Sequence, residues 1–366
     1  MTTTAPVRIG IVGLGNIGQH HADKLRLTDG VTLVGGMDVD PEARAHFSTA
    51  YDCAEYDDAT RLVADTDAII VTTPNRFHEP YAVTALDADT HVLVEKPLAH
   101  DLASAERIAE SARASDALCM VGFNNRFRKP VEVLTEYARQ GRFGDLTHVD
   151  ANYLRRRGIP GRGSWFTSKD VAGGGALVDI GVHAIDLALH FLDFPEVEEV
   201  SGVTRQTFGT DDGYAWIQMW GEDTGPGDFD VEDSATAFLR CADGTTVSLD
   251  VAWATNREEN ETYHVDGTDG GARLDRSSGD LTLYEASRAG GDHLADTDVE
   301  TRASDPHRDE QRAFVEAIRT NEHPGRNTVE QGLAVQRVID AIYRSAEAGE
   351  AVSLTEPTAV ATKGDR

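Results

Sequence analysis

Hydrophobic residues in the first third of the chain form short apolar runs, and stretches with helical spacing separate them. The runs are apolar at nearly every position, which is typical of strands covered on both faces of a sheet. Strands that alternate with helices predict a parallel, doubly wound α/β sheet. The predicted strands lie at residues 7–13, 31–37, 67–73, 91–95 and 117–123.

The pattern changes after a predicted helix that ends at Gly141. Further along, β-type runs follow one another across Gly and Asp turns with little helix between them, which predicts an open, mostly antiparallel sheet. One predicted strand lies at residues 214–220, and the acidic segments 221–233 and 288–305 are predicted to be surface loops. The predicted helices of this part lie at residues 173–193, 307–320 and 329–349.

The two patterns, in a chain of 366 residues, predict two domains that are each large enough to bury a core. We expect an α/β domain over residues 1–124 with the doubly wound parallel sheet. An α+β domain with the antiparallel sheet follows over residues 125–352. Residues 353–366 are expected to form a C-terminal tail.

The acidic composition narrows the classes of partner. The formal net charge is −29, and only five of the 34 basic residues are lysine. An acidic surface disfavours nucleic acid and anionic membranes, so neither is an expected partner. This composition suggests a halophile's cytoplasm, where salt screens the self-repulsion. A disordered acidic chain is excluded because 40% of the residues are hydrophobic and fall in periodic blocks.

Cysteine usage and the absence of long apolar runs point to the compartment. Cys53, Cys119 and Cys241 are too few and too widely spaced for a disulfide framework or a zinc site, so we expect reduced thiols. No run approaches the roughly 20 apolar residues of a membrane span, and the first residues lack the apolar core of a signal peptide. A soluble, cytoplasmic protein is therefore expected.

The first predicted strand ends in the run GLGNIG, which has the G-x-G-x-x-G spacing. Gly13 and Gly15 let the turn close and the backbone approach a pyrophosphate, and Gly18 lets the helix pack on the strand. The helix then directs its first amides, those of Asn16 and Ile17, at the phosphates. A glycine turn in another kind of βαβ unit is the alternative.

Asp38 bears on the choice of dinucleotide. It ends the next predicted strand, where an acid can hydrogen-bond a ribose 2′-hydroxyl and repel a 2′-phosphate. The next residue is Val39 rather than a basic one, so we predict NAD in preference to NADP. Arg44 argues in the other direction, because a basic side chain there can turn toward a phosphate.

The run TTPNRFHEP leaves the strand at 67–73 beside the switch point where such sheets bind ligands. Thr73, Pro74 and Asn75 are candidate cofactor contacts in this run. His78 either touches the cofactor or caps the following helix, and both interpretations are open.

The run HVLVEKPLAHD brings a lysine to the carboxyl edge of the same sheet. Pro97 fixes the backbone after Lys96, and Glu95 is close enough to share the site. An ammonium in a partly dry cleft can stabilise the alkoxide that forms when a hydroxyl loses its proton. Arginine is a poorer participant in proton transfer because its pKa is too high. A surface lysine is the alternative, although the chain has few lysines.

The run GGGALVDIGVHAID supplies partners for this lysine. Asp179 and His183 are four residues apart and share a helix face, and Asp186 lies close to the same face. A histidine with a carboxylate beside it is a ready general base near neutral pH. A structural pair in a domain interface is the alternative. A metal is disfavoured because no third ligand is near in sequence.

The ordered set of motifs resembles one family over nearly the whole chain. The motifs are GIVGLGNIG, TTPNRFH, VEKPLA, GFNNRF, GGGALVDIGVHAIDLALHFL, GTDGGARLD and AIYRSAEAGE. This set resembles the Gfo/Idh/MocA oxidoreductases, which include inositol and sugar dehydrogenases. The resemblance implies a dinucleotide-binding Rossmann domain. It also implies a second domain for substrate binding whose open sheet commonly pairs subunits, and therefore a homodimer or homotetramer.

The resemblance also implies roles for single residues. It implies a catalytic trio of Lys96, Asp179 and His183, all of which would also contact substrate. In GFNNRF, the family places residues beside the nicotinamide and the substrate, so Asn124 and Arg126 are candidates. The run YLRRRGIPGRGSWF makes Trp165 a candidate substrate contact, whereas its arginines, Arg155, Arg156 and Arg157, receive no role.

Hydride transfer from a sugar or polyol to NAD is the leading functional hypothesis. His183 would take the hydroxyl proton, Lys96 would stabilise the alkoxide, and Asp179 would orient His183 or the substrate. Two alternatives stay open: a glycosidase that oxidises its sugar transiently without consuming NAD, and a non-catalytic regulator that binds the dinucleotide. Retention of all three residues argues against the regulator, and fold alone names no substrate.

Overall fold

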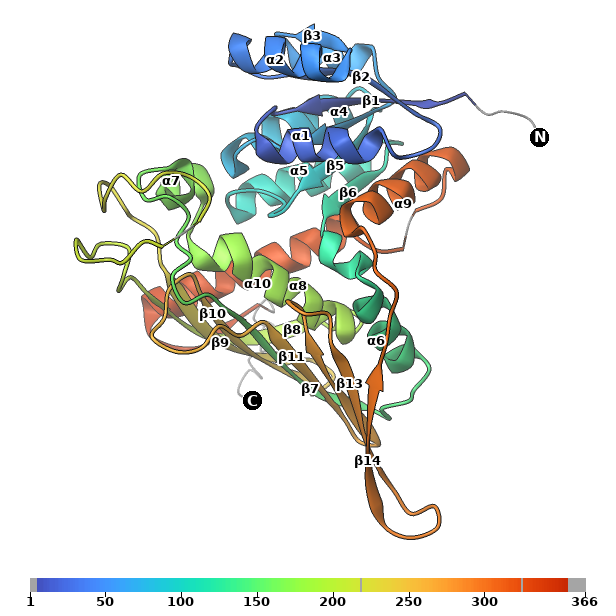
Figure 1. Ribbon diagram of the computed structural model, residues 1–366, viewed down its shortest axis with the longest axis vertical. Coiled ribbons are helices and arrows are strands. Elements are labelled where there is room, and N and C mark those ends of the chain that lie inside the picture. Colours follow the sequence, from blue (N-terminus) through green and yellow to red (C-terminus); the bar gives the residue numbers. More distant parts are fainter. Residues whose placement is uncertain (1–4, 218, 324, 355–366) are drawn as a thin grey trace, which may run out of the picture.

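The computed structural model describes residues 5–217, 219–323 and 325–354, and Figure 1 shows its two sheets one above the other. Residues 355–366 of the predicted tail lie outside the described residues. The first sheet has the order β3-β2-β1-β4-β5-β6 with parallel pairs throughout, which confirms the doubly wound sheet. Its strands are β1 (Val7–Val12), β2 (Val31–Met37), β3 (Ala54–Tyr56), β4 (Ala68–Val71), β5 (His91–Glu95) and β6 (Cys119–Gly122).

Helices cover both faces of this sheet. Successive strand residues point to opposite sides, and since the strands are apolar at nearly every position, both faces must be covered. Ile69 and Val71 of β4 belong to one core cluster, and Ala68 and Ile70 belong to the other. Aspartates at the N-caps of α2, α3 and α5 accept backbone N–H groups of the first turn, which fixes where these helices begin. The helices are α1 (Asn16–Leu25), α2 (Pro41–Tyr51), α3 (Ala59–Ala64), α4 (His78–Leu86) and α5 (Leu102–Ala114).

The second sheet has nine strands in the order β14-β13-β12-β11-β7-β10-β9-β8-β15. Strands β7 and β10 pair in parallel, and the other described pairs are antiparallel, which confirms a mostly antiparallel sheet. The strands are β7 (Leu146–Leu154), β8 (Val197–Arg205), β9 (Ser234–Cys241), β10 (Thr246–Ala252), β11 (Thr262–Gly267), β12 (Gly270–Asp275), β13 (Leu281–Ser287), β14 (His293–Val299) and β15 (Val352–Ser353).

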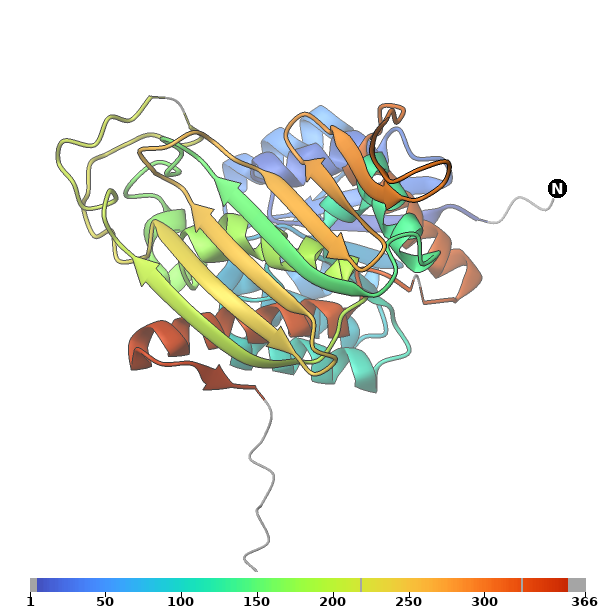
Figure 2. The ribbon, with the colours of Figure 1, turned by 90° about the horizontal axis from the view of Figure 1, so that it is seen from below.

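Helices lie on one face of the second sheet, between it and the first sheet (Figure 1). Figure 2 shows the opposite face, which no helix of the described residues covers. The homodimer or homotetramer that would use this face stays a prediction. The helices on this face are α6 (Lys129–Arg139), α8 (Val182–Phe191) and α10 (Val329–Ala348). Helix α7 (Lys169–Ala172) contacts the short helical turns η1 (Asn75–Phe77), which follows β4, and η3 (Trp165–Thr167). The other short helical turns are η2 (Asn124–Phe127) and η4 (Leu177–Gly181).

The last two helices tie the sheets together. Helix α9 (Pro306–Thr320) returns to the first sheet, where Phe314 and Val315 join the core that contains the buried residues of α1. Helix α10 contacts α5 of the first layer and β8 of the second sheet. The boundary at residue 124 stays a prediction, because α9 packs on the layer that precedes this boundary in sequence.

Two local predictions are wrong, and one strand was missed. The described residues of 214–220 form an irregular loop rather than a strand, and the predicted loop at 288–305 contains β14. The short strand β3 was not predicted. The alternation of apolar residues at 214–220 reflects packing of single side chains such as Tyr214, which is buried. Strand β14 is an edge strand with mostly exposed residues, so it lacks the apolar alternation that identifies a strand.

The predicted helix at 173–193 is present in two parts, the π-helical turn η4 and then α8. One helical stretch of the described residues, Lys169–Phe191, has a mean hydropathy of 1.4 and is long and apolar enough to cross a membrane. Most of that apolar window, 78%, is buried inside the molecule, so this is weak evidence for a membrane span.

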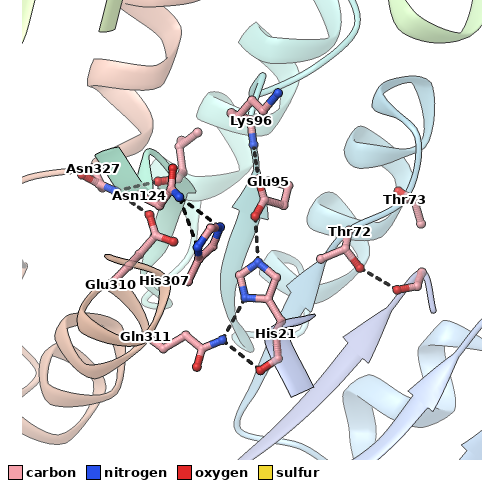
Figure 3. A network of polar contacts seen from close by, with 12 residues as sticks. His21, Thr72, Thr73, Glu95, Lys96, Asn124, His307, Glu310, Gln311 and Asn327 are labelled. Carbon is pink, nitrogen blue, oxygen red and sulfur yellow. Dashed lines mark hydrogen bonds and ion pairs between the residues drawn. The ribbon is translucent and has the colours of Figure 1, made fainter. Parts of the chain in front are cut away.

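A buried acid and amide fasten α9 to β6 (Figure 3). The amide nitrogen of Asn327 donates to Glu310 Oε1 at 3.0 Å and to the carbonyl of Val121 at 3.0 Å. Glu310 Oε2 and Asn327 Oδ1 are both buried without a partner. Burial and the nearby carboxylates of Glu95 and Asp186 raise the pKa of Glu310 well above its usual range. A neutral acid supplies the missing donor, because its hydroxyl can bond Asn327 Oδ1.

Replacing Glu310 by its neutral isostere tests this assignment. The folded protein keeps a proton that the unfolded chain releases above about pH 4.3, so wild-type stability loses this contribution as the pH rises. We expect Glu310→Gln to match wild type near pH 4.5 and to be more stable than wild type at pH 8, measured by chemical denaturation. Glu316→Gln, at an exposed position of the same helix, is the control. A fall in stability for Glu310→Gln at pH 8 would show that Glu310 is ionised.

Candidate active site

The phosphate loop lies between β1 and α1. Gly13 has a φ of +95°, and a Cβ there would lie 2.8 Å from the backbone of Thr72. A Cβ on Gly18 would overlap the carbonyl of Gly13, whereas Gly15 faces open space. Thr72 Oγ1 donates to the Gly13 carbonyl at 2.6 Å, which braces the turn from β4 (Figure 3). The loop is therefore tight on the protein side and open where a pyrophosphate would approach.

The start of α1 is free to bind an anion. Gly15 at the N-cap has no side chain to cap the helix, and the first turn holds no acidic residue. Asn16 and Ile17 are exposed there. Unsatisfied amides at a helix N-terminus attract negative charge, so these residues fit the pyrophosphate of a dinucleotide.

Asp38 lies at the end of β2 and is braced by the loops around it. Its Oδ2 accepts from the amide of Leu14 at 2.8 Å, and its Oδ1 accepts from the amide of Asp40 at 3.0 Å. Arg44 Nη1 donates to the backbone carbonyls of Asp38 and Val39. The carboxylate therefore has a fixed position at the strand end, and the guanidinium that could favour a 2′-phosphate is engaged with the backbone.

The TTPNRFHEP run holds the two layers together at the strand end. Asn75 is buried and donates to the carbonyl of Ala172 in α7 at 2.8 Å. Both ring nitrogens of His78 lie 2.9 Å from carbonyl oxygens, those of Pro97 and Thr73. Burial lowers the pKa of His78. His78 is thus a buried structural residue near the start of α4, whereas Pro74 is half-buried beside it.

Glu95 belongs to a buried hydrogen-bond chain (Figure 3). Its Oε1 lies 2.7 Å from Nε2 of His21, and its Oε2 accepts from the Lys96 amide at 3.1 Å. Gln311 of α9 donates to Nδ1 of the same histidine at 2.9 Å, so the proton of His21 lies on the nitrogen that faces Glu95. Burial would raise the pKa of Glu95, but His21, His307 and Lys96 lower it to about 2. Glu95 is therefore ionised.

The GFNNRF run places its side chains differently from the prediction. Asn124 Nδ2 lies 3.0 Å from Nε2 of His307 on α9 (Figure 3). Arg126 has no exposed surface, and its guanidinium bonds Asp186 at 2.5 to 3.1 Å and Gln331 at 2.5 Å. The prediction that Arg126 contacts substrate is therefore wrong, because its donors face the interior and a buried partner holds them.

Lys96 reaches from the end of β5 to the turn η4 of the second layer. Its Nζ donates to the backbone carbonyl of Asp179 at 2.7 Å and to Oδ1 of the same residue at 3.1 Å. The third hydrogen of the ammonium is left for a ligand. Lys96 is 21% exposed and Asp179 only 8%, so the pair is largely buried and the ammonium is its more accessible end.

Asp179 is surrounded by donors. Its Oδ2 accepts from the indole of Trp253 at 2.9 Å and lies 3.7 Å from Nη1 of Arg155. Burial would raise the pKa of this carboxyl, but the charges of Lys96 and Arg155 and the Trp253 bond outweigh it, so the pKa lies below its usual value. Asp179 is therefore a fixed anion that positions Lys96.

His183 is bonded to Asn125 instead of to Asp179. Its Nδ1 lies 3.0 Å from Nδ2 of Asn125, whose Oδ1 accepts from Nε of Arg128 at 3.0 Å. Because Arg128 holds the amide oxygen, the amide nitrogen faces the ring, and a neutral ring carries its proton on Nε2. Burial, together with the charges of Lys96, Arg276 and Arg155, lowers the pKa of His183 well below its usual value.

Sequence reasoning missed four residues of this cluster: Asn125, Arg128, Arg155 and Trp253. Asn125 and Arg128 lie in or beside the GFNNRF run, so the signal for them was the same as for Asn124. Arg155 lies in the arginine run that received no role. Arg157 of that run instead bonds the Thr255 carbonyl and Asn256, away from Asp179. Trp165 stacks on Phe166 and is half-buried.

Metal chemistry finds no support in this arrangement. Among the residues that the structure describes, no group of three His, Cys, Asp or Glu side chains is placed to hold a metal ion. The donors near the cleft are instead an ammonium, an imidazole and guanidinium groups, which suit a hydroxyl and its oxyanion.

The chain belongs to the Gfo/Idh/MocA oxidoreductase family. Residues 7–123 match the oxidoreductase family with an NAD-binding Rossmann fold, and residues 131–273 match the GFO/IDH/MocA C-terminal domain. D-glucoside 3-dehydrogenase of Escherichia coli (strain K12) is 30% identical over 369 residues, which cover 96% of this chain and 99% of that protein. D-xylose 1-dehydrogenase (NADP(+)) 2 of Haloferax volcanii is 28% identical over 80% of this chain and 82% of that protein.

A solved structure has the same fold. Levoglucosan dehydrogenase in complex with NADH and levoglucosan superposes with a TM-score of 0.83. The superposition covers 96% of this chain and all of the other, at 21% sequence identity. At this identity the likeness shows the fold alone.

The buried pair of Arg126 and Asp186 allows a test of its structural role. Neither side chain is exposed, so Arg126→Met leaves an uncompensated carboxylate in the interior. We expect a loss of about 3 to 5 kcal/mol of unfolding free energy, measured by chemical denaturation. Arg139→Met removes an exposed partner of Asp193 and should cost less than about 1 kcal/mol. A stable Arg126→Met protein with weakened substrate binding would restore the original prediction.

Proposed function

We propose that the protein is an NAD-dependent oxidoreductase that transfers a hydride between a hydroxyl-bearing carbon of a sugar or polyol and the nicotinamide. The observation that carries the proposal is the Lys96 ammonium, which is held by Asp179 beside His183 at the carboxyl edge of the parallel sheet. Family membership supports hydride chemistry, and the relatives include dehydrogenases of glucosides and of xylose.

The phosphate loop and the neighbouring strand ends would hold the cofactor. NAD fits the open space at Gly15 and the free start of α1. When bound, it supplies the acceptor for the hydride. The proposed cofactor contacts are Gly13, Gly15, Asn16, Ile17, Gly18, Asp38, Thr73, Pro74, Glu95, Lys96 and Asn124. Asn75 and His78 would support the wall behind them, because their polar atoms are engaged with the protein.

Three side chains would handle the substrate hydroxyl. Lys96 donates its free hydrogen to the oxygen and stabilises the alkoxide that forms as the proton leaves. His183 takes this proton at Nε2. Asp179 holds the ammonium in place, and we assign it this positioning role because its two oxygens bond Lys96 and Trp253.

The base role of His183 requires a small rearrangement. A ring that accepts a proton at Nε2 must carry its other proton on Nδ1, so Asn125 must turn its amide oxygen toward that nitrogen. The turn breaks the bond from Arg128 to the amide oxygen. A hydrogen bond from a charged donor is worth about 1.5 to 3 kcal/mol, which is small beside the barrier to hydride transfer. The tautomer seen in the structure is therefore compatible with a base.

Replacing the proton-handling residues tests the mechanism. Lys96→Met should lower kcat by roughly two to three orders of magnitude, because one donor to the developing oxyanion is lost. His183→Ala should lower kcat comparably, and more at neutral pH than at high pH, where hydroxide partly replaces the base. Because the pKa of His183 lies below its usual value, the acid limb of the wild-type kcat/KM profile should lie below about pH 6.5. NADH formation is followed at 340 nm.

The control for Lys96→Met is Lys129→Met. Lys129 has nearly the same exposure and is also paired with carboxylates, but its partners are Glu132 and Asp309, which take no part in the proposed chemistry. A titration of NADH fluorescence separates a binding defect from a chemical one, since the phosphate loop is unchanged in each variant. Near wild-type kcat for Lys96→Met would rule out this mechanism. Release of an aglycone without net NADH would instead identify the transient-oxidation glycosidase.

We propose NAD rather than NADP as the cofactor, because Asp38 is fixed at the strand end and Arg44 is engaged with the backbone. We expect NAD⁺ to bind at least about tenfold more tightly than NADP⁺, since a carboxylate repels a 2′-phosphate. Asp38→Asn keeps the bond to the Leu14 amide and should reduce the preference for NAD⁺ over NADP⁺. Asp40→Asn removes a neighbouring charge and should leave that preference unchanged. Tighter binding of NADP⁺ by wild type, measured by calorimetry, would reverse the assignment.

A further inference from the structure

Three aromatic side chains form a strip beside the catalytic cluster. Trp165 and Phe166 stack with their ring centroids 3.8 Å apart, and the Trp220 ring lies 6.3 Å from that of Phe166. Trp220 is 45% exposed, and the other two are half-buried. We call these three residues the aromatic strip. A large apolar side chain that stays this exposed next to a polar site is typical of ligand contact.

Arg155 joins the aromatic strip to the catalytic carboxylate. Its guanidinium carbon lies 4.9 Å from the Trp220 ring centroid, and its Nη1 lies 3.7 Å from Oδ2 of Asp179. The Asp179 carboxylate is the one that holds Lys96. Arg155 therefore lies close to both Asp179 and Trp220. The aromatic strip is thus near enough to Lys96 for the second ring of a substrate bound there to reach it.

The loop that carries Trp220 is fastened to the arginine run. The amide of Gly161 donates to the Trp220 carbonyl at 3.0 Å. Arg162 is almost fully buried, bonds both oxygens of Asp223 at 2.8 and 3.0 Å, and accepts at its carbonyl from Thr224. These bonds assign a structural role to the run YLRRRGIPGRGSWF, because it fixes the loop that carries Trp220 beside Phe166 of the same run.

We infer that the aromatic strip is a subsite for a second sugar ring, so that the preferred substrates are disaccharides rather than free monosaccharides. Aromatic faces pack on the C–H faces of a pyranose. Arg155 donates to the Gly158 carbonyl and the Tyr153 hydroxyl at 3.4 Å, and its remaining N–H groups can bond the hydroxyls of the second ring. The oxidised ring would lie at Lys96 and the second ring on Trp220. This inference rests on the proposed function, since it names the substrate class of the same site.

A matched series of sugars tests the subsite. The three sugars are glucose, methyl β-glucoside and cellobiose. Turnover is measured as NADH formation in the presence of NAD⁺, and binding is measured by calorimetry in the presence of NADH. Wild type should bind cellobiose most tightly. Trp220→Ala should weaken cellobiose binding and raise its KM about three- to tenfold, the usual effect of one lost aromatic contact, and leave glucose within about twofold. Trp220→Phe should recover most of the loss.

The control is Ile217→Ala, which truncates a 74% exposed side chain of the same loop outside the aromatic strip. It should leave all three sugars unaffected. The subsite is overturned if wild type binds cellobiose no more tightly than methyl β-glucoside, or if Trp220→Ala and wild type bind cellobiose equally. It is also overturned if none of the three sugars binds. Binding that depends on Trp220 without any NADH formation supports the subsite and overturns the proposed function instead.

Discussion

The bond between the Lys96 ammonium and Asp179 is the interaction on which the site depends, because it joins the two layers of the molecule. Lys96 follows β5 of the first sheet, and Asp179 lies in η4, which leads into α8 on the second sheet. Burial disfavours an anion at this place, so the carboxylate needs the cations and the Trp253 indole around it. Without the carboxylate, Lys96 and Arg155 would be unpaired in a nearly closed space. The pair therefore serves the docking of the layers as well as the chemistry.

Two hydrogen-bond chains extend from this centre into the protein and keep it rigid. One runs from the backbone amide of Lys96 through Glu95 and His21 to α9 (Figure 3). The other runs from His183 through Asn125 to Arg128. Each chain sets the tautomer of one histidine, because the hydrogen-bond partner of one ring nitrogen decides whether the other nitrogen carries the proton. The proton positions in the cleft are thus decided by residues behind it.

Local pattern was sufficient to predict five of the six strands of the first sheet, the phosphate loop and the strand end that carries Lys96. It also placed Asp179 and His183 on one helical stretch, but the spacing suggested that they bond each other. In the structure Asp179 bonds Lys96 and Trp253, while His183 bonds Asn125. These partners are distant in sequence, and the packing of the second sheet against the first brings them together. The π-helical turn η4, which short-range spacing does not indicate, also sets how the segment meets the cleft.

Charge at the cleft has the opposite sign to the charge of the whole chain. The net charge is −29, yet the charges of Lys96, Arg276 and Arg155 add to the effect of burial and lower the pKa of His183. These cations help to keep the imidazole neutral, so it can accept a proton, but they also make it a weaker base. In the proposed mechanism the same cations would stabilise the alkoxide, in direct contact with Lys96, and would therefore make the substrate hydroxyl a stronger acid. The contact distance favours the alkoxide, because its negative charge appears closer to the ammonium than the positive charge that the imidazole gains. A local surplus of positive charge in an acidic protein thus assists removal of the proton.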